Sequence, residues 1–212
     1  MTQKPSLLII GNSNVGKSSI TRLLVPNPRK FKGKIGKSPG STLLIKSINQ
    51  ENLAYNIVDL PGFGYVSQSS RRREEHIKNQ IVIHIEKHYK DYFLGLVVIN
   101  TLRIEDELKK YFIENEKTIP LSFELVNFLK EFSIPLLIII NKIDKISIID
   151  KRRIITFFIN SAKSYGLDFI ELNNFNPNNR IQIPLLEFSA LKKINLHKLK
   201  EFIQINLNRI DV

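Results

Sequence analysis

The sequence predicts a three-layer α/β fold around a mostly parallel sheet of six strands with one antiparallel edge strand. Short apolar runs alternate with longer amphipathic stretches, an order typical of strands connected by helices. Two of the runs, 94–99 and 136–140, are unbroken, as expected of strands buried on both faces. The runs at 43–48 and 53–58 are separated by a short turn-like segment, so they predict an antiparallel hairpin at one edge.

The remaining elements follow from the spacing of apolar residues. Further strands are expected at 7–10 and 183–188, and the Asn-rich segment 168–182 is expected to be a loop. Apolar positions three or four residues apart predict helices. These helices are expected at 16–24, at 74–88, at 121–132, after a capping Asp150, and from about 195 to the end. The charged segment 103–119 is expected to add a short surface helix.

The composition sets bounds on the kind of protein. The chain has 212 residues, no cysteine and a net charge of +12. One domain over 1–212 is expected at this length. The lack of cysteine excludes a disulfide scaffold, a thiol nucleophile and a cysteine-ligated zinc or iron–sulfur site. No apolar run approaches the ~18 residues that span a bilayer, so a soluble, cytoplasmic, monomeric protein without membrane contact is expected.

The strongest motif is a phosphate-binding loop. Residues 11–18, GNSNVGKS, match the pattern G-x-x-x-x-G-K-[ST] between an expected strand and an expected helix. In such a loop the backbone amides surround the phosphates, Lys17 neutralises the β and γ phosphates, and the Ser18 hydroxyl binds Mg²⁺. The predicted nucleotide contacts here are Gly11, Asn12, Ser13, Asn14, Val15, Gly16, Lys17, Ser18 and Ser19.

A second element lies at the end of the expected hairpin. Asp59, Leu60, Pro61 and Gly62 form a D-x-P-G sequence, which by itself is most often an ordinary turn. Downstream of a phosphate loop, the acid is expected to face the Mg²⁺ water shell, and the Gly62 amide is expected to meet the γ-phosphate.

A third element predicts the base that is bound. Asn141, Lys142 and Asp144 follow the strand at 136–140. An aspartate can accept hydrogen bonds from guanine N1 and N2, whereas adenine would leave that carboxylate unpaired, so guanine is predicted. Asn141 is expected to bond the base edge and Lys142 to pack its stem over the base or sugar. A backbone amide is expected to reach guanine O6 from the segment Ser189, Ala190 and Leu191.

The ordered set resembles a translation-factor-class P-loop GTPase of Ras-like fold. The closer resemblance is to the EngB family of ribosome-biogenesis GTPases, and to its archaeal type. It rests on GNSNVGKSS at 11–19, SPGST at 38–42, DLPGFGYV at 59–66, NKID at 141–144 and FSALKK at 188–193. The charged insertion at 103–118 departs from the family, and the resemblance gives it no role.

The resemblance implies further site residues. Thr42 matches the switch threonine whose hydroxyl binds Mg²⁺; alternatively it simply begins a strand. Phe63 stands where Ras-like relatives have the catalytic glutamine, so slow hydrolysis is expected. Asn14 matches an asparagine that holds K⁺ in some relatives, and the rival reading is a polar loop filler. Catalysis is thus assigned to Lys17, Thr42, Gly62 and Asn14, with Mg²⁺ on Ser18, Thr42 and Asp59. Nucleotide contacts in the first switch are assigned to Lys37, Ser38, Pro39, Gly40 and Ser41.

The positive charge is uneven. Residues 1–58 hold nine Lys and Arg against one acid, Glu51. This predicts a polyanionic partner, most simply ribosomal RNA or a ribosomal subunit; the alternative is an ordinary solvated basic surface. The family implies large-subunit assembly and a link to cell division and septation. Two rival functions stay open: a GDP/GTP-binding scaffold with little turnover, and an RNA- or septum-associated protein without a ribosomal client.

Overall fold

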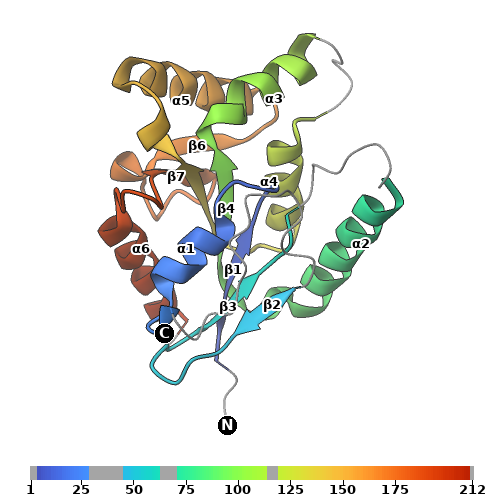
Figure 1. The fold of residues 1–212 in the computed structure, drawn as a ribbon, viewed down its shortest axis with the longest axis vertical. Helices are drawn as coiled ribbons and strands as arrows, with labels where there is room; N and C mark the ends of the chain where they lie inside the picture. Colours follow the sequence, from blue (N-terminus) through green and yellow to red (C-terminus); the bar gives the residue numbers. More distant parts are fainter. Residues whose placement is uncertain (1–3, 29–44, 63–70, 114–118, 211–212) are drawn as a thin grey trace.

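A computed structural model describes residues 4–28, 45–62, 71–113 and 119–210 of the chain. Its strands form one seven-stranded sheet in the order β2-β3-β1-β4-β5-β7-β6 (Figure 1). β2 pairs antiparallel with β3, and every other neighbouring pair is parallel. The strands are β1 (Ser6–Ile10), β2 (Lys46–Ile48), β3 (Asn56–Asp59), β4 (Tyr92–Asn100), β5 (Leu136–Asn141), β6 (Asp168–Glu171) and β7 (Gln182–Phe188).

Helices cover both faces of the sheet, which gives the three expected layers (Figure 1). α1 and α6 pack on one face, and α2, α3, α4 and α5 pack on the other. None of the helices in the described residues is long and apolar enough to cross a membrane. The helices are α1 (Lys17–Leu24), α2 (Arg71–His88), α3 (Thr101–Ile113), α4 (Leu121–Glu131), α5 (Ile148–Lys163) and α6 (Leu196–Asn208), with short 3-10 turns η3 (Tyr89–Asp91), η4 (Ile143–Lys145) and η5 (Leu172–Asn174).

The central strands explain why the sheet is buried from both sides. Every residue of β1, β4 and β5 is buried. Along β1, Leu8 and Ile10 join one apolar cluster, whereas Leu7 and Ile9 join the other. This alternation is the two-residue period of a strand, and it needs apolar residues at every position when both faces are covered.

The expected edge hairpin is present, with a different start for its second strand. β2 pairs with β3 in the register Ser47↔Val58. β3 begins at Asn56, and the turn before it contains Leu53 and Tyr55, which are both buried. The large apolar residues of the run 53–58 are therefore all buried, but only its second half pairs as a strand.

The expectation of six strands is wrong by one. β6 lies inside 168–182, where the sequence predicts a loop. It has four residues, of which only Phe169 is buried, and it pairs with β7 alone at the sheet edge. A strand this short shows no clear alternation, so its pairing depends on the neighbouring strand rather than on its own sequence.

The charged insertion forms a helix, as expected, but it is not confined to the surface. In α3, Ile104 and Leu108 are each 1% exposed and belong to the core beneath the sheet. The expected cap of the next helix is also displaced. Ser147, not Asp150, caps α5, because its Oγ accepts a hydrogen bond from the Asp150 amide at 3.1 Å.

Candidate functional site

The phosphate loop connects β1 to α1 at the carboxyl edge of the sheet, and two glycines give it its path. Gly11 has φ +146°, and a Cβ there would lie 2.2 Å from the Val98 carbonyl oxygen. Gly16 has φ +104°, and a Cβ there would lie 2.3 Å from Asn141 Nδ2. Both positions therefore exclude a side chain by backbone strain and by contact. The two invariable positions of the motif pattern correspond to real steric limits in this fold.

Lys17 lies folded inside the loop. Its ammonium group donates hydrogen bonds of 2.9 Å to the carbonyl oxygens of Gly11 and Asn12. The side chain is 7% exposed. Burial lowers the pKa of Lys17 to about 8, against the opposing effect of the Asp59 carboxylate. A buried ammonium with a lowered pKa gains strongly from an incoming anion, so the loop is suited to a phosphate.

Asp59 and Ser18 lie together beside this lysine. The Ser18 hydroxyl donates to Asp59 Oδ2 at 3.2 Å. Asp59 Oδ1 is buried and has no hydrogen-bond partner among the described residues. Burial raises the pKa of Asp59, which Lys17 and the Ser18 hydrogen bond partly offset. An unpaired buried carboxylate oxygen next to a hydroxyl fits a magnesium ion that completes its shell with water and phosphate oxygens.

The rest of the D-x-P-G segment lies directly on the phosphate loop. The Ser13 hydroxyl donates to the Gly62 carbonyl at 3.1 Å. A Cβ at Gly62 would lie 2.7 Å from Ser13 Cα and 2.8 Å from Lys17 Nζ. The Gly62 backbone is therefore close enough to contact a group bound to Lys17. A residue with a side chain would collide with the phosphate loop at this position. Leu60 is fully buried below it.

Asn141 joins three loops of the site. Its Nδ2 donates to the Val15 carbonyl at 2.7 Å, and its Oδ1 accepts from the Ala190 amide at 3.0 Å. The residue is 1% exposed. Because Asn141 ends β5 while the other two segments follow β1 and β7, one amide side chain fixes the ends of three strands relative to one another.

The other two residues of the predicted base selector are also held in place. Lys142 has φ +71°, and its ammonium donates to the Asn14 carbonyl at 2.6 Å. Burial, and then the nearby Arg103, lower the pKa of Lys142. Asp144 Oδ1 accepts from the Ser189 hydroxyl at 2.6 Å. The carboxylate is therefore oriented before any base arrives.

Two details differ in role from the sequence expectations. A backbone amide of the segment 189–191 is expected to meet the base, and the amide of Ala190 in that segment donates to Asn141 Oδ1 in this structure. The sequence pointed only to backbone amides in this segment, but the side chain of Ser189 also takes part, because its hydroxyl orients Asp144. Asn14 has φ +62°, a conformation that asparagine tolerates. Leu191 is 68% exposed beside these groups.

Several predicted residues lie outside the described part of the chain. They are the first-switch residues Lys37, Ser38, Pro39, Gly40, Ser41 and Thr42, together with Phe63. The described site therefore comprises the phosphate loop, the D-x-P-G segment, the base selector and the segment after β7.

Thr101, the first residue of α3, belongs to the site although no sequence motif points to it. Its hydroxyl donates to the Asn141 carbonyl at 2.7 Å, and the side chain is 1% exposed. The only sequence signal is its place directly after β4, whose last residue, Asn100, is in register with Asn141.

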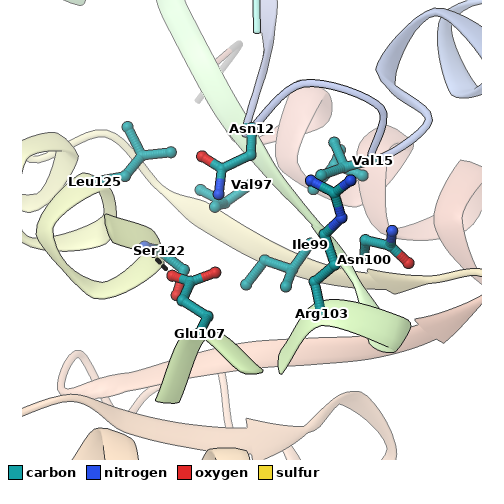
Figure 2. A pocket seen from close by; sticks show the side chains of 11 residues that line it. Asn12, Val15, Val97, Ile99, Asn100, Arg103, Glu107, Ser122 and Leu125 are labelled. Carbon is teal, nitrogen blue, oxygen red and sulfur yellow. Dashed lines mark hydrogen bonds between the residues drawn. The ribbon is translucent and has the colours of Figure 1, made fainter. Parts of the chain in front are cut away.

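Figure 2 shows that the insertion lies beside the phosphate loop. Arg103 and Glu107 of α3 line a pocket together with Asn12 and Val15 of the loop. Glu107 Oε1 also accepts from the Ser122 amide at 2.9 Å, at the start of α4 (Figure 2). α3 therefore lines a pocket directly beside the phosphate loop.

Comparison with known families agrees with this geometry. Residues 6–142 match the family described as 50S ribosome-binding GTPase. The chain belongs to this family.

Similar proteins include EngB proteins of archaea. The chain is 34% identical to the probable GTP-binding protein EngB of Methanococcus aeolicus over 69% of this chain and 61% of that one. It is 32% identical to its counterpart in Methanopyrus kandleri over 69% of each chain. The chain thus matches less than two thirds of the length of the first of these relatives.

A solved structure of an EngB protein is similar over almost the whole chain. The crystal structure of a probable GTP-binding protein engB aligns with a TM-score of 0.73 at 26% identity, covering 96% of this chain and 99% of that one. The EngB resemblance inferred from the motifs is therefore confirmed, as is the P-loop GTPase fold.

Proposed function

We propose that this chain is a single G domain that binds Mg²⁺ with GTP or GDP, hydrolyses GTP slowly, and acts as a nucleotide switch in assembly of the large ribosomal subunit. The observation that carries the nucleotide part is Asp144. Its carboxylate is half-buried and already oriented by Ser189, at the end of a loop fixed to the phosphate loop through Asn141. A preoriented carboxylate that only guanine can satisfy gives base selection without rearrangement.

The phosphate end supports binding of a charged triphosphate. Lys17 exchanges its carbonyl partners for phosphate oxygens and regains full protonation. Ser18, Thr42 and Asp59 would hold the magnesium ion, which would supply charge neutralisation at the phosphate oxygens. Gly62 supplies a backbone amide close to Lys17, so its position responds to whether a terminal phosphate is present. These residues bind and orient the phosphates rather than take part in covalent chemistry.

Slow turnover is proposed because of Phe63. A phenyl ring cannot orient the attacking water, and that role falls to another group. A K⁺ ion held by Asn14 is our candidate for supplying part of the missing charge stabilisation. The competing function, a scaffold that holds nucleotide with little turnover, rests on the same phenylalanine. GTP turnover measured in potassium and in sodium, with and without ribosomal subunits, separates the two.

The ribosomal part rests on the family and on charge. The matched family is described as ribosome-binding, and residues 1–58 have eight more basic than acidic side chains. We propose ribosomal RNA of the large subunit as the contact, and we attribute the link to cell division and septation to that role. Co-sedimentation with large subunits should occur with a non-hydrolysable GTP analogue, weaken with GDP, and fall steeply with salt.

The deciding experiment is a nucleotide titration with GTP, GDP and ATP in the presence of Mg²⁺. Guanine nucleotides should bind and ATP should not. Asp144→Asn should lose GTP affinity and gain affinity for xanthosine triphosphate, in which a carbonyl replaces the N2 amino group. An unchanged GTP affinity in Asp144→Asn, or equal binding of ATP, would overturn the guanine assignment.

A further inference from the structure

A groove separates α3 from the start of α5, on the side of the molecule where these two helices lie next to each other (Figure 1). It has a cavity volume of about 330 Å³. α3 contributes Leu102, Glu105 and Asp106, and the opposite wall contributes Ile146, Asp150 and Arg153. We call it the α3–α5 groove. One of its walls is the insertion for which neither the nucleotide site nor the family resemblance supplies a role.

Exposed apolar side chains lie in the lining of the groove or close to a lining residue in the sequence. Leu102 is 48% exposed, and Ile148 and Ile149 in the first turn of α5 are each 77% exposed. Ile149 precedes Arg153 by four residues, so it lies one turn before it on the same side of the helix. Apolar groups exposed this far, next to charged groups, are typical of a protein interaction site.

The charge of the groove is opposite to that of the chain. Its lining holds three carboxylates, Glu105, Asp106 and Asp150, against one cation, Arg153. Arg153 forms ion pairs with Glu105 and, at 3.5 Å, with Asp150. An acidic lining disfavours an RNA phosphate backbone and favours a cationic protein segment. The exposed Leu102, Ile148 and Ile149 require that the same segment also present leucine-like side chains.

Both walls of the groove continue into the base-selecting loop. Thr101, which lies at the end of the groove, donates its buried hydroxyl to the Asn141 carbonyl at 2.7 Å. On the other wall, Ile146 follows Asp144 by two residues. Displacement of either wall would therefore shift residues that hold the base selector in place.

We propose that the α3–α5 groove binds a cationic amphipathic segment of a protein partner, and that its occupation changes the affinity for guanine nucleotide. The docking half is independent of the function proposed above. The coupling half rests on guanine binding at Asp144.

The docking half is tested with a defined probe and the full chain. The probe is a fluorescein-labelled helical peptide of about 16 residues, made of Lys with Leu at every third or fourth position, and the matched control peptide has Glu in place of Lys. Fluorescence anisotropy should show binding of the Lys peptide and none of the Glu peptide. The double variant Leu102→Ser/Ile149→Ser should weaken binding by about tenfold or more, since both side chains contribute apolar contact area.

A matched variant controls for general apolar attraction. Ile181→Ser removes an isoleucine that is 68% exposed outside the groove, and peptide binding should remain within about twofold. Asp106→Asn should weaken binding of the Lys peptide, with an effect that shrinks at high salt. Equal loss in Ile181→Ser, equal binding of the Glu peptide, or an unaffected double variant would each overturn the docking proposal. So would a dimer in sedimentation that the double variant dissociates, because the occupant would then be a second copy of the chain.

The coupling half has a separate readout. Peptide affinity should differ by about fivefold or more between the GDP-bound and nucleotide-free protein, and the peptide should change GDP affinity by the same factor. Thr101→Val should reduce this difference while the nucleotide-free protein still binds the peptide. Identical peptide affinity in both states would overturn the coupling alone. Failure of GDP to bind at all would overturn the proposed function and leave the docking result standing.

Discussion

Replacing Asn141 with alanine tests the central connection of the site. The side chain is 1% exposed and makes two hydrogen bonds, to the Val15 carbonyl and from the Ala190 amide. Its removal leaves both backbone groups without these partners, at about 1–3 kcal/mol for each group that stays unpaired. Ala190 is only half-buried, so water can partly replace the partner of its amide, and a total near the lower end, about 3 kcal/mol, is expected. For a chain of this size that corresponds to a fall in Tm of about 6–12 °C.

The assay is thermal unfolding followed by circular dichroism in the absence of nucleotide, so that ligand binding does not enter. Asn178→Ala in the exposed turn before β7 is the matched control and should stay within about 1 °C. Asn141→Asp sharpens the test. It keeps the acceptor for Ala190 but turns a carboxylate oxygen toward the Val15 carbonyl, so it should be less stable than the alanine variant. A Tm of Asn141→Ala within about 2 °C of the parent protein would refute the proposed connection.

Three further outcomes are expected. Gly62→Ala should weaken GTP binding more than GDP binding, because its Cβ would lie 2.7 Å from Ser13 Cα and 2.8 Å from Lys17 Nζ; titration of both nucleotides checks this. Asp59→Asn should raise the Tm of the nucleotide-free protein, since burial disfavours the Asp59 carboxylate, yet lower Mg²⁺-dependent GTP affinity by about tenfold or more. Nucleotide affinity should be flat below pH 7 and fall by up to about tenfold per pH unit above pH 8. The free protein then holds Lys17 neutral, at a pKa of about 8, and must take up a proton to bind the phosphates. Calorimetry in two buffers of different ionisation enthalpy measures that proton directly, and its absence at pH 8.5 would contradict the lowered pKa.

The sign of the Lys17 effect on folding follows from the same shift. Its pKa is lower in the folded chain than the ordinary value of 10.5, so the folded state binds fewer protons between pH 8 and pH 10.5. Lysine burial therefore opposes folding below pH 8, and this opposition is relieved as the pH rises through that window. At neutral pH the buried Lys17 ammonium therefore destabilises the folded protein, and a bound anionic ligand offsets this destabilisation.

The sequence alone was enough to predict the strands and loops that are marked by a run or spacing of neighbouring residues. Unbroken apolar runs predicted β4 and β5, since strands covered on both faces need an apolar residue at each position. The spacing of Gly11, Gly16 and Lys17 predicted the phosphate loop, because it is typical of a loop that passes between a strand and a helix with its amides turned inward. The motifs were sufficient to identify the family, because all of them occur in the expected order along one chain.

Only the tertiary structure decided which distant groups complete the site. β6 exists because β7 offers it a partner, and α3 is partly buried because its Ile104 meets the core under the sheet. Ser189 orients Asp144 across 45 positions of sequence, and Thr101 holds Asn141 across 40. Such pairs follow from the parallel strand order, which brings the carboxyl ends of separate strands together. The spacing of residues along the sequence gives no signal for these distant pairs, because they meet only after the strands have assembled into the sheet.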